Sequence, residues 1–326
     1  MSASKLFAFS AAFLVVVVII LSFPKKMQTT SDVTKGCLAE IKREPFIEEV
    51  VEFANAPPPI SSICPDDELP KAIDRVAELF NSFAPFVPLV QTVNYTTRVA
   101  WLNGRPAYLG DFAQHYKTSK HFISRSLTGG LSYVCETVHL GDRFNVLRED
   151  KNIEFHLVLD LSRLKLWIYA YDVDEQRRYL LKNYPVAAGR LSEKARSGCL
   201  TPTGVFSIGK ECAVYEEGML GTWRQKEVEL ISVFGIRWIP LGVEVAHCSA
   251  SCKGIGFHGV PWLRDSKTDR LVECQTSIGS YSSGGCIRLL SSDIEELYSL
   301  VTSRPSFVHI VQDFSLAHLP GEEVDW

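Results

Sequence analysis

The sequence has no block of lysines and arginines anywhere along its 326 residues. Its 34 basic and 38 acidic residues leave a formal net charge of −4. A nucleic-acid-binding protein needs a basic stripe or patch to meet the phosphate backbone. Nucleic acid is therefore excluded as an expected partner.

The sequence also lacks the second Cys/His pair that a zinc site would need. His247, Cys248 and Cys252 lie close together, and such spacing does occur in zinc sites. A complete structural site takes four ligands. We therefore expect a disulfide or free thiols here rather than a metal.

Cysteine itself is not scarce, and the number of cysteines is odd. An odd count fits one free thiol and eight others that can pair in an oxidising compartment, with a connectivity that sequence does not give. The nine are Cys37, Cys64, Cys135, Cys199, Cys212, Cys248, Cys252, Cys274 and Cys286.

Residues 6–23 form an uncharged run rich in valine and isoleucine. Its length reaches the lower limit for a membrane-spanning helix and exceeds the apolar core of a usual signal peptide. Pro24-Lys25-Lys26 follows, without a small-x-small cleavage site. We expect residues 1–26 to be an uncleaved membrane anchor, with a cleaved signal peptide as the alternative.

Residues 27–104 are expected to form a stalk and a helical linker. Ala56-Pro57-Pro58-Pro59 favours extended polyproline geometry. The apolar spacing over residues 66–83 predicts a packing helix that starts at acidic residues.

Two glycine-rich segments carry the chemistry. One reads Gly-Phe-His258-Gly259, and the other reads Ser283-Gly284-Gly285-Cys286-Ile-Arg288. Glycine permits positive φ and close approach of the backbone to a ligand. A thiol needs a nearby base to act as an acyl-transfer nucleophile, and His258 is the candidate base for Cys286. The alternative interpretation of Cys286 is a buried cysteine that behaves as a small hydrophobic residue.

These segments resemble the signature of the L,D-transpeptidases, the YkuD-fold cysteine enzymes that cross-link peptidoglycan. His258-Gly259 and Gly285-Cys286-Ile287-Arg288 match the pattern of that family. Two departures are present. Gly284 stands where the family has a histidine, and the spacer between the two segments is longer. The longer spacer predicts an inserted loop, residues 264–275, over the cleft.

The resemblance implies a role for each residue of the two segments. Cys286 is the expected nucleophile and His258 the general base and acid. Gly285 is expected to donate its backbone N–H to an oxyanion, and Ser283 to support the catalytic pair by a hydrogen bond. The expected substrate-binding residues are Arg288, Gly259 and Gly284; for Arg288, a salt bridge that holds the loop is equally compatible. No metal and no cofactor are implied.

A mostly β catalytic domain is expected over residues 151–314, followed by a tail over residues 315–326. Short β-rich runs at residues 155–160 and 164–169 predict a hairpin, and residues 233–239 and 307–311 predict further strands. The segment Thr201-Pro-Thr-Gly204-Val-Phe resembles a second motif of the same enzymes. A helix over residues 293–301, capped by Ser291 or Ser292, follows the nucleophile. Many short strands with glycine and proline turns favour a β-sandwich or an open barrel.

Residues 105–150 resemble a degenerate LysM module, a small α/β unit that binds glycan strands of cell walls. The resemblance rests on Tyr108-Leu-Gly-Asp111 as a first strand, on two short helices after it and on residues 138–147 as a closing strand. A generic packing unit of the same β-α-α-β order is the alternative.

The resemblances together imply a single-pass protein of the cytoplasmic membrane whose catalytic domain lies in the periplasm or outside. Its partners would be peptidoglycan stem peptides and glycan strands, and carbapenems would inhibit it. The alternatives are an L,D-carboxypeptidase, an enzyme that attaches a protein to the wall, a catalytically decayed wall-binding protein, and a disulfide-rich scaffold in which Cys286 is bridged. Asp265, Asp269 and Glu273 on the inserted loop form a solvated face, or attract a cationic acceptor amine if the loop covers the cleft.

Overall fold

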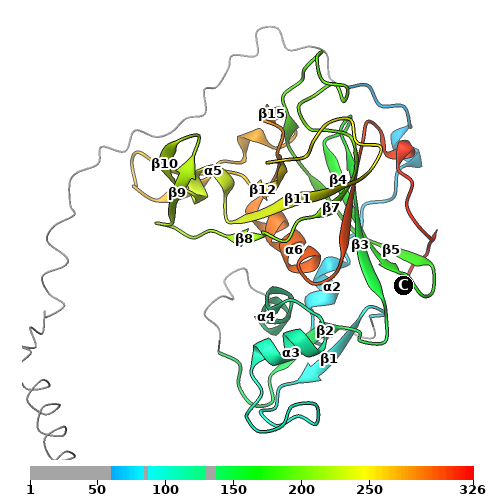
Figure 1. Cartoon of the computed structure of the whole chain (residues 1–326), viewed down its shortest axis with the longest axis vertical. Helices are drawn as coiled ribbons and strands as arrows, with labels where there is room; N and C mark the ends of the chain where they lie inside the picture. The colour runs from blue at the N-terminus through cyan, green and yellow to red at the C-terminus, as the bar shows by residue number, and fades with distance from the viewer. Residues whose placement is uncertain (1–59, 84–86, 129–136) are drawn as a thin grey trace, which may run out of the picture. The chain divides into compact units, whose positions relative to one another are not determined.

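The computed structural model describes residues 60–83, 87–128 and 137–326 (Figure 1). Its main element is a curled ten-stranded sheet with the order β16-β12-β11-β7-β17-β3-β4-β5-β18, in which β8 also pairs with β11. The strands are β3 (Ile153–Asp160), β4 (Lys165–Asp172), β5 (Arg177–Pro185), β7 (Gly204–Ile208), β8 (Ala213–Val214), β11 (Arg237–Ala246), β12 (Gly256–Gly259), β16 (Ile287–Leu289), β17 (Ser306–Val311) and β18 (Glu322–Glu323). The predicted mostly β fold is confirmed.

The centre of the sheet is buried on both faces. Strands β3, β4 and β5 form an antiparallel meander, and β17 lies parallel to β3 on its other side. Nearly every residue of β3 and β4 is buried, which explains their almost continuous apolar sequence. The predicted hairpin over these two strands is confirmed.

Helix α6 (Ser291–Val301) follows β16 and packs on β11 and β12. Its apolar side chains Ile294, Leu297 and Leu300 belong to the main core. The predicted helix is confirmed, but neither predicted serine caps it. The N-cap is Leu290, and the Ser291 N–H donates to the Glu273 carboxylate at 2.5 Å. A carboxylate at a helix N-terminus satisfies an otherwise unpaired N–H and complements the helix dipole.

A smaller unit precedes the large sheet. Strands β1 (Val90–Asn94) and β2 (Arg143–Leu147) pair antiparallel, and helices α3 (Leu109–His115) and α4 (Lys120–Thr128) lie between them in sequence. The unit has its own core around Phe112, Ile123 and Phe144. The predicted first strand at residues 108–111 is wrong, because a capping box between Tyr108 and Asp111 starts α3 there.

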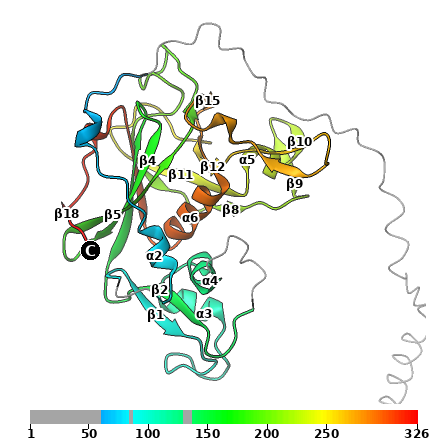
Figure 2. The same cartoon turned by 180° about the vertical axis from the view of Figure 1, so that it is seen from behind.

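Glu295 joins the smaller unit to the unit that contains the large sheet. Figures 1 and 2 both show α4 beside α6. The fully buried Glu295 carboxylate of α6 pairs with Arg125 of α4 and lies 4.0 Å from Arg237 of β11. A buried carboxylate is stable only when such partners compensate its lost hydration.

The helix predicted over residues 66–83 is shorter than expected. The chain forms a 3₁₀ turn, η1 (Asp66–Glu68), and then helix α2 (Val76–Phe80). Between them it follows the edge of β5, where the Arg75 N–H donates to the Leu181 carbonyl at 2.8 Å. Pro70 interrupts any continuous helix because it lacks an N–H group.

The remaining elements decorate one end of the sheet. The strand predicted over residues 233–239 is divided, because Gly235, at φ +61°, separates a short helix from β11. The elements at this end are β6 (Ala188–Gly189), β9 (Leu220–Trp223), β10 (Lys226–Glu229), α5 (Ile231–Phe234), β13 (Trp262–Arg264), β14 (Leu271–Glu273), η2 (Gln275–Ser277) and β15 (Tyr281–Ser283), and η3 (Phe314–Leu316) follows β17.

Among the described residues, no helix has both the length and the apolar character needed to span a bilayer. The anchor predicted over residues 6–23 lies outside the described residues, as do Cys37 and Cys135.

Candidate active site

Cys286 stands between β15 and β16 on a loop that buried hydroxyl groups hold in place. The Ser283 hydroxyl donates to the Cys286 carbonyl at 2.6 Å and accepts from the Gly285 N–H at 3.0 Å. The fully buried Thr201 hydroxyl donates to the Gly285 carbonyl at 2.9 Å. Satisfied buried hydrogen bonds of this kind fix a single loop conformation. Ser283 thus supports the loop that carries the thiol, and Thr201 explains why the Thr-Pro-x-Gly motif belongs to the same site.

Gly285 is required by its backbone conformation. Its φ is +127°, and a Cβ built there would stand 3.1 Å from the Leu200 carbonyl oxygen. Residues other than glycine rarely adopt that φ. The predicted oxyanion role of Gly285 needs correction, because in this conformation its N–H donates to Ser283. The Cys286 and Gly284 N–H groups are the remaining candidates at this loop.

His258 lies on the strand next to the loop of Cys286. Strand β12 pairs in parallel with β16, and His258 stands opposite Arg288. Cys286 itself lies one residue before β16, and its Sγ is 3.7 Å from the carbonyl oxygen of Gly254, which lies two residues before β12. The thiol is thus close to the segment that leads into the strand of His258.

The imidazole of His258 is buried, with 4% of the residue exposed. Its Nδ1 lies 2.7 Å from the Gly259 carbonyl oxygen, so Nδ1 carries the proton and Nε2 is left as the acceptor. Burial first, and then the charge of Arg288, lower the pKa of His258 to about 3. The imidazole is therefore neutral at neutral pH, which is the protonation state that a general base needs, although the lowered pKa also weakens it as a base.

Gly259 does not lie at a substrate-facing position, which corrects the prediction for this residue. It is buried, and a Cβ added to Gly235 would stand 2.6 Å from the Gly259 Cα. Two glycines here let the turn after α5 pack directly on β12. Gly259 therefore holds His258 through its carbonyl.

Gly284 and Arg288 lie two residues before and two residues after Cys286. Gly284 is exposed, and the nearest atom to a Cβ built on it is Nη2 of Arg224, at 3.9 Å. Arg288 is 8% exposed, and its backbone bonds in both directions with Ala187. Sequence reasoning missed Arg224, because it lies sixty residues earlier on the turn between β9 and β10.

Seven cysteines lie in the described residues, and none of them forms a disulfide with another of the seven: Cys64, Cys199, Cys212, Cys248, Cys252, Cys274 and Cys286. Of the two alternatives expected for Cys248 and Cys252, a disulfide or free thiols, the structure shows free thiols. No group of three or more His, Cys, Asp or Glu side chains in the described part of the chain could hold a metal ion.

Two of the three acidic side chains of the predicted inserted loop accept hydrogen bonds from backbone N–H groups. Asp265 accepts the N–H groups of Lys267 and Thr268 within the turn of the β13–β14 hairpin. Glu273 caps α6, which corrects its assignment to a solvated face. Asp269 alone of the three leaves its carboxylate mostly exposed, at 91%.

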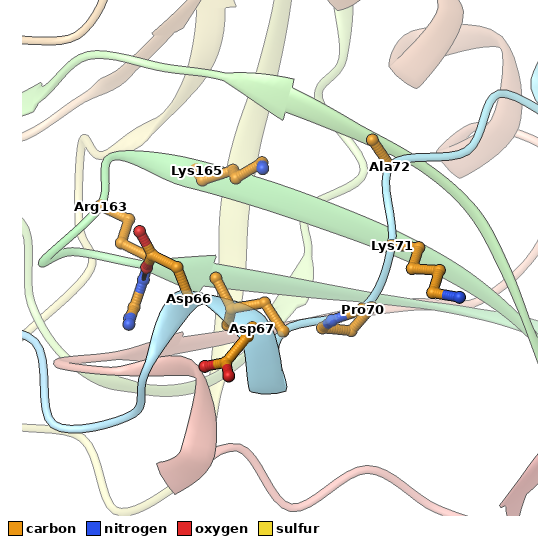
Figure 3. Close-up of a pocket in the computed structure, with 8 residues that line it drawn as sticks. Asp66, Asp67, Pro70, Lys71, Ala72, Arg163 and Lys165 are labelled. Atoms are coloured by element: carbon orange, nitrogen blue, oxygen red, sulfur yellow. Dashed lines mark hydrogen bonds and ion pairs between the residues drawn. The ribbon is translucent and has the colours of Figure 1, made fainter.

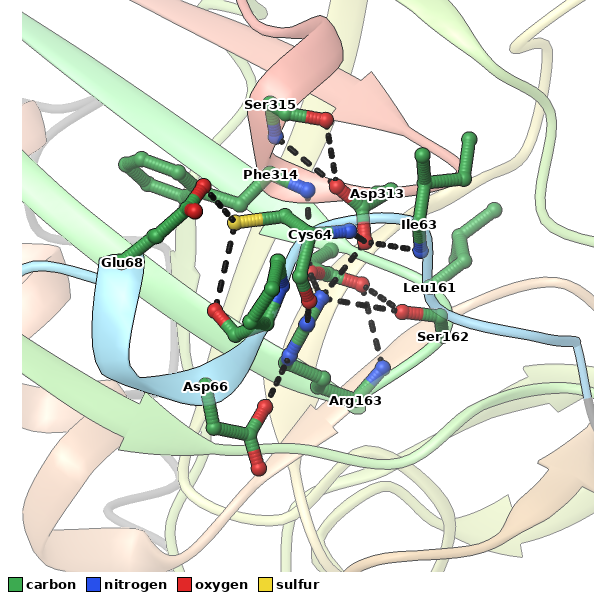
Figure 4. Close-up of polar contacts among 12 residues, drawn as sticks. Ile63, Cys64, Asp66, Glu68, Leu161, Ser162, Arg163, Asp313, Phe314 and Ser315 are labelled. Atoms are coloured by element: carbon green, nitrogen blue, oxygen red, sulfur yellow. Dashed lines mark hydrogen bonds and ion pairs between the residues drawn. The ribbon is translucent and has the colours of Figure 1, made fainter.

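Away from Cys286, a hollow of about 590 Å³ lies between residues 66–72 and the β3–β4 turn (Figure 3). Its lining contains no cysteine or histidine, and we assign it no chemistry. Beside it, Arg163 binds Asp160, Asp313 and Asp66 at 2.7 to 2.8 Å (Figure 4). Asp313 also accepts the Cys64 N–H at 3.2 Å. This cluster ties the segment before α2 to the sheet, so Cys64 has a structural setting.

Stability is expected to fall as the pH is lowered from about 6.5 to 5. Burial lowers the pKa of His258 to about 3 and of His156 and His309 to about 4. The unfolded chain takes up protons on these histidines below about pH 6.5 while the folded protein does not. Each one then contributes a slope of up to about 1.4 kcal/mol per pH unit.

Urea unfolding at pH 7, 6 and 5 measures this slope. His309→Phe should flatten it, because His309 Nε2 lies 3.1 Å from His156 Nδ1 in a buried pair. A free energy of unfolding that stays constant over this range in the unmodified protein would contradict the argument.

The comparison with known proteins agrees with the family resemblance that the sequence motifs indicated. Residues 154–310 match the family model of the L,D-transpeptidase catalytic domain, YkuD, which confirms the resemblance drawn from the motifs. No curated protein matches the chain. Among solved structures, Bd1075 from Bdellovibrio bacteriovorus is 15% identical with a TM-score of 0.33, and the match covers 49% of this chain and 48% of Bd1075.

A second solved structure is the helical cell shape determining protein Pgp2 from Campylobacter jejuni. It is 18% identical with a TM-score of 0.31, and the match covers 53% of this chain and 51% of Pgp2. The chain thus matches about half the length of each of these structures.

Proposed function

From the premise that residues 154–310 form an L,D-transpeptidase catalytic domain, we propose that the protein is an active cysteine transpeptidase acting on peptidoglycan stem peptides. The observation that carries the proposal is the parallel pairing of β12 and β16. This pairing brings a buried neutral imidazole, His258, next to the strand that begins one residue after Cys286. A thiol with a base near enough to take its proton is the minimum that covalent acyl transfer requires.

In the proposed reaction, Cys286 Sγ attacks the carbonyl carbon of the third, diamino-acid residue of a tetrapeptide stem. His258 Nε2 takes the thiol proton and passes it to the amide nitrogen as the C–N bond breaks and terminal D-Ala leaves. The resulting thioester is then attacked by an acceptor amine, whose proton His258 removes. The product is a 3→3 cross-link, and the thiol is regenerated.

The oxyanion formed in each step needs fixed donors. The Cys286 N–H and the Gly284 N–H are the proposed donors, because Gly285 N–H donates to Ser283. Ser283 and Thr201 act as positioning residues, since they hold the loop through the Cys286 and Gly285 carbonyls.

Hydrolysis of the same thioester by water would give L,D-carboxypeptidase activity, and an amine on a protein would give wall attachment. The second candidate class is a catalytically decayed wall-binding protein, favoured by glycine at position 284 in place of the family histidine. Residues 105–150 would then bind glycan strands. We propose further that residues 6–23 anchor the protein in the cytoplasmic membrane with the catalytic domain on its outer side.

The test is a digest of isolated peptidoglycan with the purified protein, analysed by mass spectrometry. Dimers joined by a 3→3 amide bond are expected to accumulate, and a carbapenem is expected to add its mass to Cys286. Tripeptides without dimers would identify the carboxypeptidase. Unchanged wall material together with no carbapenem adduct would refute the enzyme and leave the binding protein.

A further inference from the structure

Arg224 projects over the loop that carries the nucleophile. It lies at the tip of the β9–β10 hairpin, where Trp223 pairs with Lys226 across a two-residue turn. Its Nη2 atom comes within 3.9 Å of a Cβ built on Gly284, two residues before Cys286. Because Gly284 has no side chain, nothing of residue 284 itself separates the guanidinium from the loop backbone.

The guanidinium of Arg224 has no anionic partner in residues 60–83, 87–128 and 137–326. It stacks on the ring of Trp223, with Cζ 4.3 Å from the ring centroid, and the residue is exposed. The stacking orients the side chain but leaves its five N–H donors available. An oriented guanidinium without a carboxylate is suited to bind one from a ligand.

The two-residue turn that contains Arg224 lacks the residue types that favour a turn of this kind. Arg224 and Gln225 have φ values of +49° and +66°. Two-residue hairpin turns of this kind prefer Asn-Gly, and non-glycine residues in this region are strained. The side chain at position 224 is therefore retained at a conformational cost, which points to a role in function.

The hairpin is also fixed in place relative to the active site. The Leu230 N–H donates to the Met219 carbonyl at 2.8 Å at the base of the hairpin, where α5 begins. Phe234 at the end of α5 packs on the His258 ring at 5.6 Å between centroids. The element that positions Arg224 thus also contacts the proposed base.

We propose that Arg224 binds a carboxylate of the donor stem peptide close to the scissile bond, and so makes a free carboxylate a requirement for the donor. Arg288, beside His258, provides a second cation on the other side of Cys286. The inference rests on the proposed function. A stem peptide offers two such groups, the terminal carboxylate of D-Ala and the side-chain carboxylate of the diamino acid.

The test measures kcat and KM of the full-length protein with three synthetic tetrapeptides: the free acid, its C-terminal amide, and a peptide amidated at the diamino-acid carboxylate. The unmodified protein should prefer the free acid roughly tenfold over one of the amides, as one charge-assisted contact allows. Arg224→Gln should raise KM for the free acid by roughly tenfold and remove that preference. Arg224→Lys should be intermediate, because it keeps the charge and loses the planar fork.

Two further variants separate recognition from folding. The double change Arg224→Asn with Gln225→Gly gives the hairpin its preferred turn and should lose the preference equally. Arg177→Gln removes the same charge at the exposed end of the β4–β5 hairpin, which Figures 1 and 2 place far from β9 and β10, and should change nothing. A preference that survives in both Arg224 variants, or is absent from the unmodified protein, overturns the proposal.

If the proposed function is wrong, the results differ from those expected if the Arg224 proposal is wrong. Binding of the acid and amide peptides to the Cys286→Ala protein, measured by calorimetry, reports the carboxylate preference without any turnover. An unmodified protein that turns over no peptide, while the Cys286→Ala protein still prefers the acid through Arg224, would refute the enzyme and support the site. Equal binding of acid and amides would overturn the Arg224 proposal.

Discussion

Replacing Cys286 by alanine is expected to reduce 3→3 dimer formation by roughly 10⁴-fold or more, to the level of the reaction without enzyme. Ser283 is not placed to replace the thiol, since it is 1% exposed and its hydroxyl donates to the Cys286 carbonyl. Muropeptide analysis with equal amounts of the unmodified and variant proteins measures the effect.

The matched control is Cys274→Ala. Cys274 is a second partly exposed cysteine, and its thiol lies 3.3 Å from the Thr276 hydroxyl. Its removal should leave dimer formation within about twofold of the unmodified protein, since surface changes of this kind rarely alter the fold. Equal activity of the Cys286→Ala protein would show that the thiol is not the nucleophile and would end the proposed mechanism.

Replacing Glu295 by alanine is expected to lower the free energy of unfolding by about 3–5 kcal/mol. Glu295 is fully buried, and its carboxylate faces Arg125 and Arg237 while it also accepts from the Ser299 hydroxyl at 3.2 Å. Its loss leaves two arginines buried beside each other without their shared anion, together with a cavity.

Chemical unfolding monitored by circular dichroism measures this loss, with Glu193→Ala, at an exposed position, as the control. The expected change for the control is within about 0.5 kcal/mol. A Glu295→Ala protein as stable as the control would mean that α4 and α6 are not held together by this ion cluster. Since Glu295 lies outside the catalytic loop, the folded fraction of the variant should keep its kcat.

The local sequence was sufficient to predict the buried strands and the two glycine-rich motifs. Alternating and continuous apolar runs predicted β3, β4 and β17, because burial on a sheet demands them. The pair His258 and Cys286 was proposed from glycine-rich motifs, and the tertiary structure places His258 on β12 and Cys286 directly before the neighbouring strand β16. The roles of the individual glycines were less well predicted, because a glycine indicates that another group packs close to the backbone but does not indicate which residue that group belongs to. Gly259 packs against Gly235, and Gly285 N–H bonds Ser283.

What the sequence by itself determined was the similarity of residues 154–310 to the L,D-transpeptidase catalytic domain, the two motifs that contain His258 and Cys286, and the mostly β class, since short motifs and apolar periodicity encode these locally. Only the tertiary structure decided that Thr201 braces the loop, that Glu273 caps α6, and that Arg224 stands over Gly284. Each of these contacts joins residues separated by eighteen to eighty-four positions. No local pattern marks such pairs, because they form only when the sheet curls and brings distant loops to the same end.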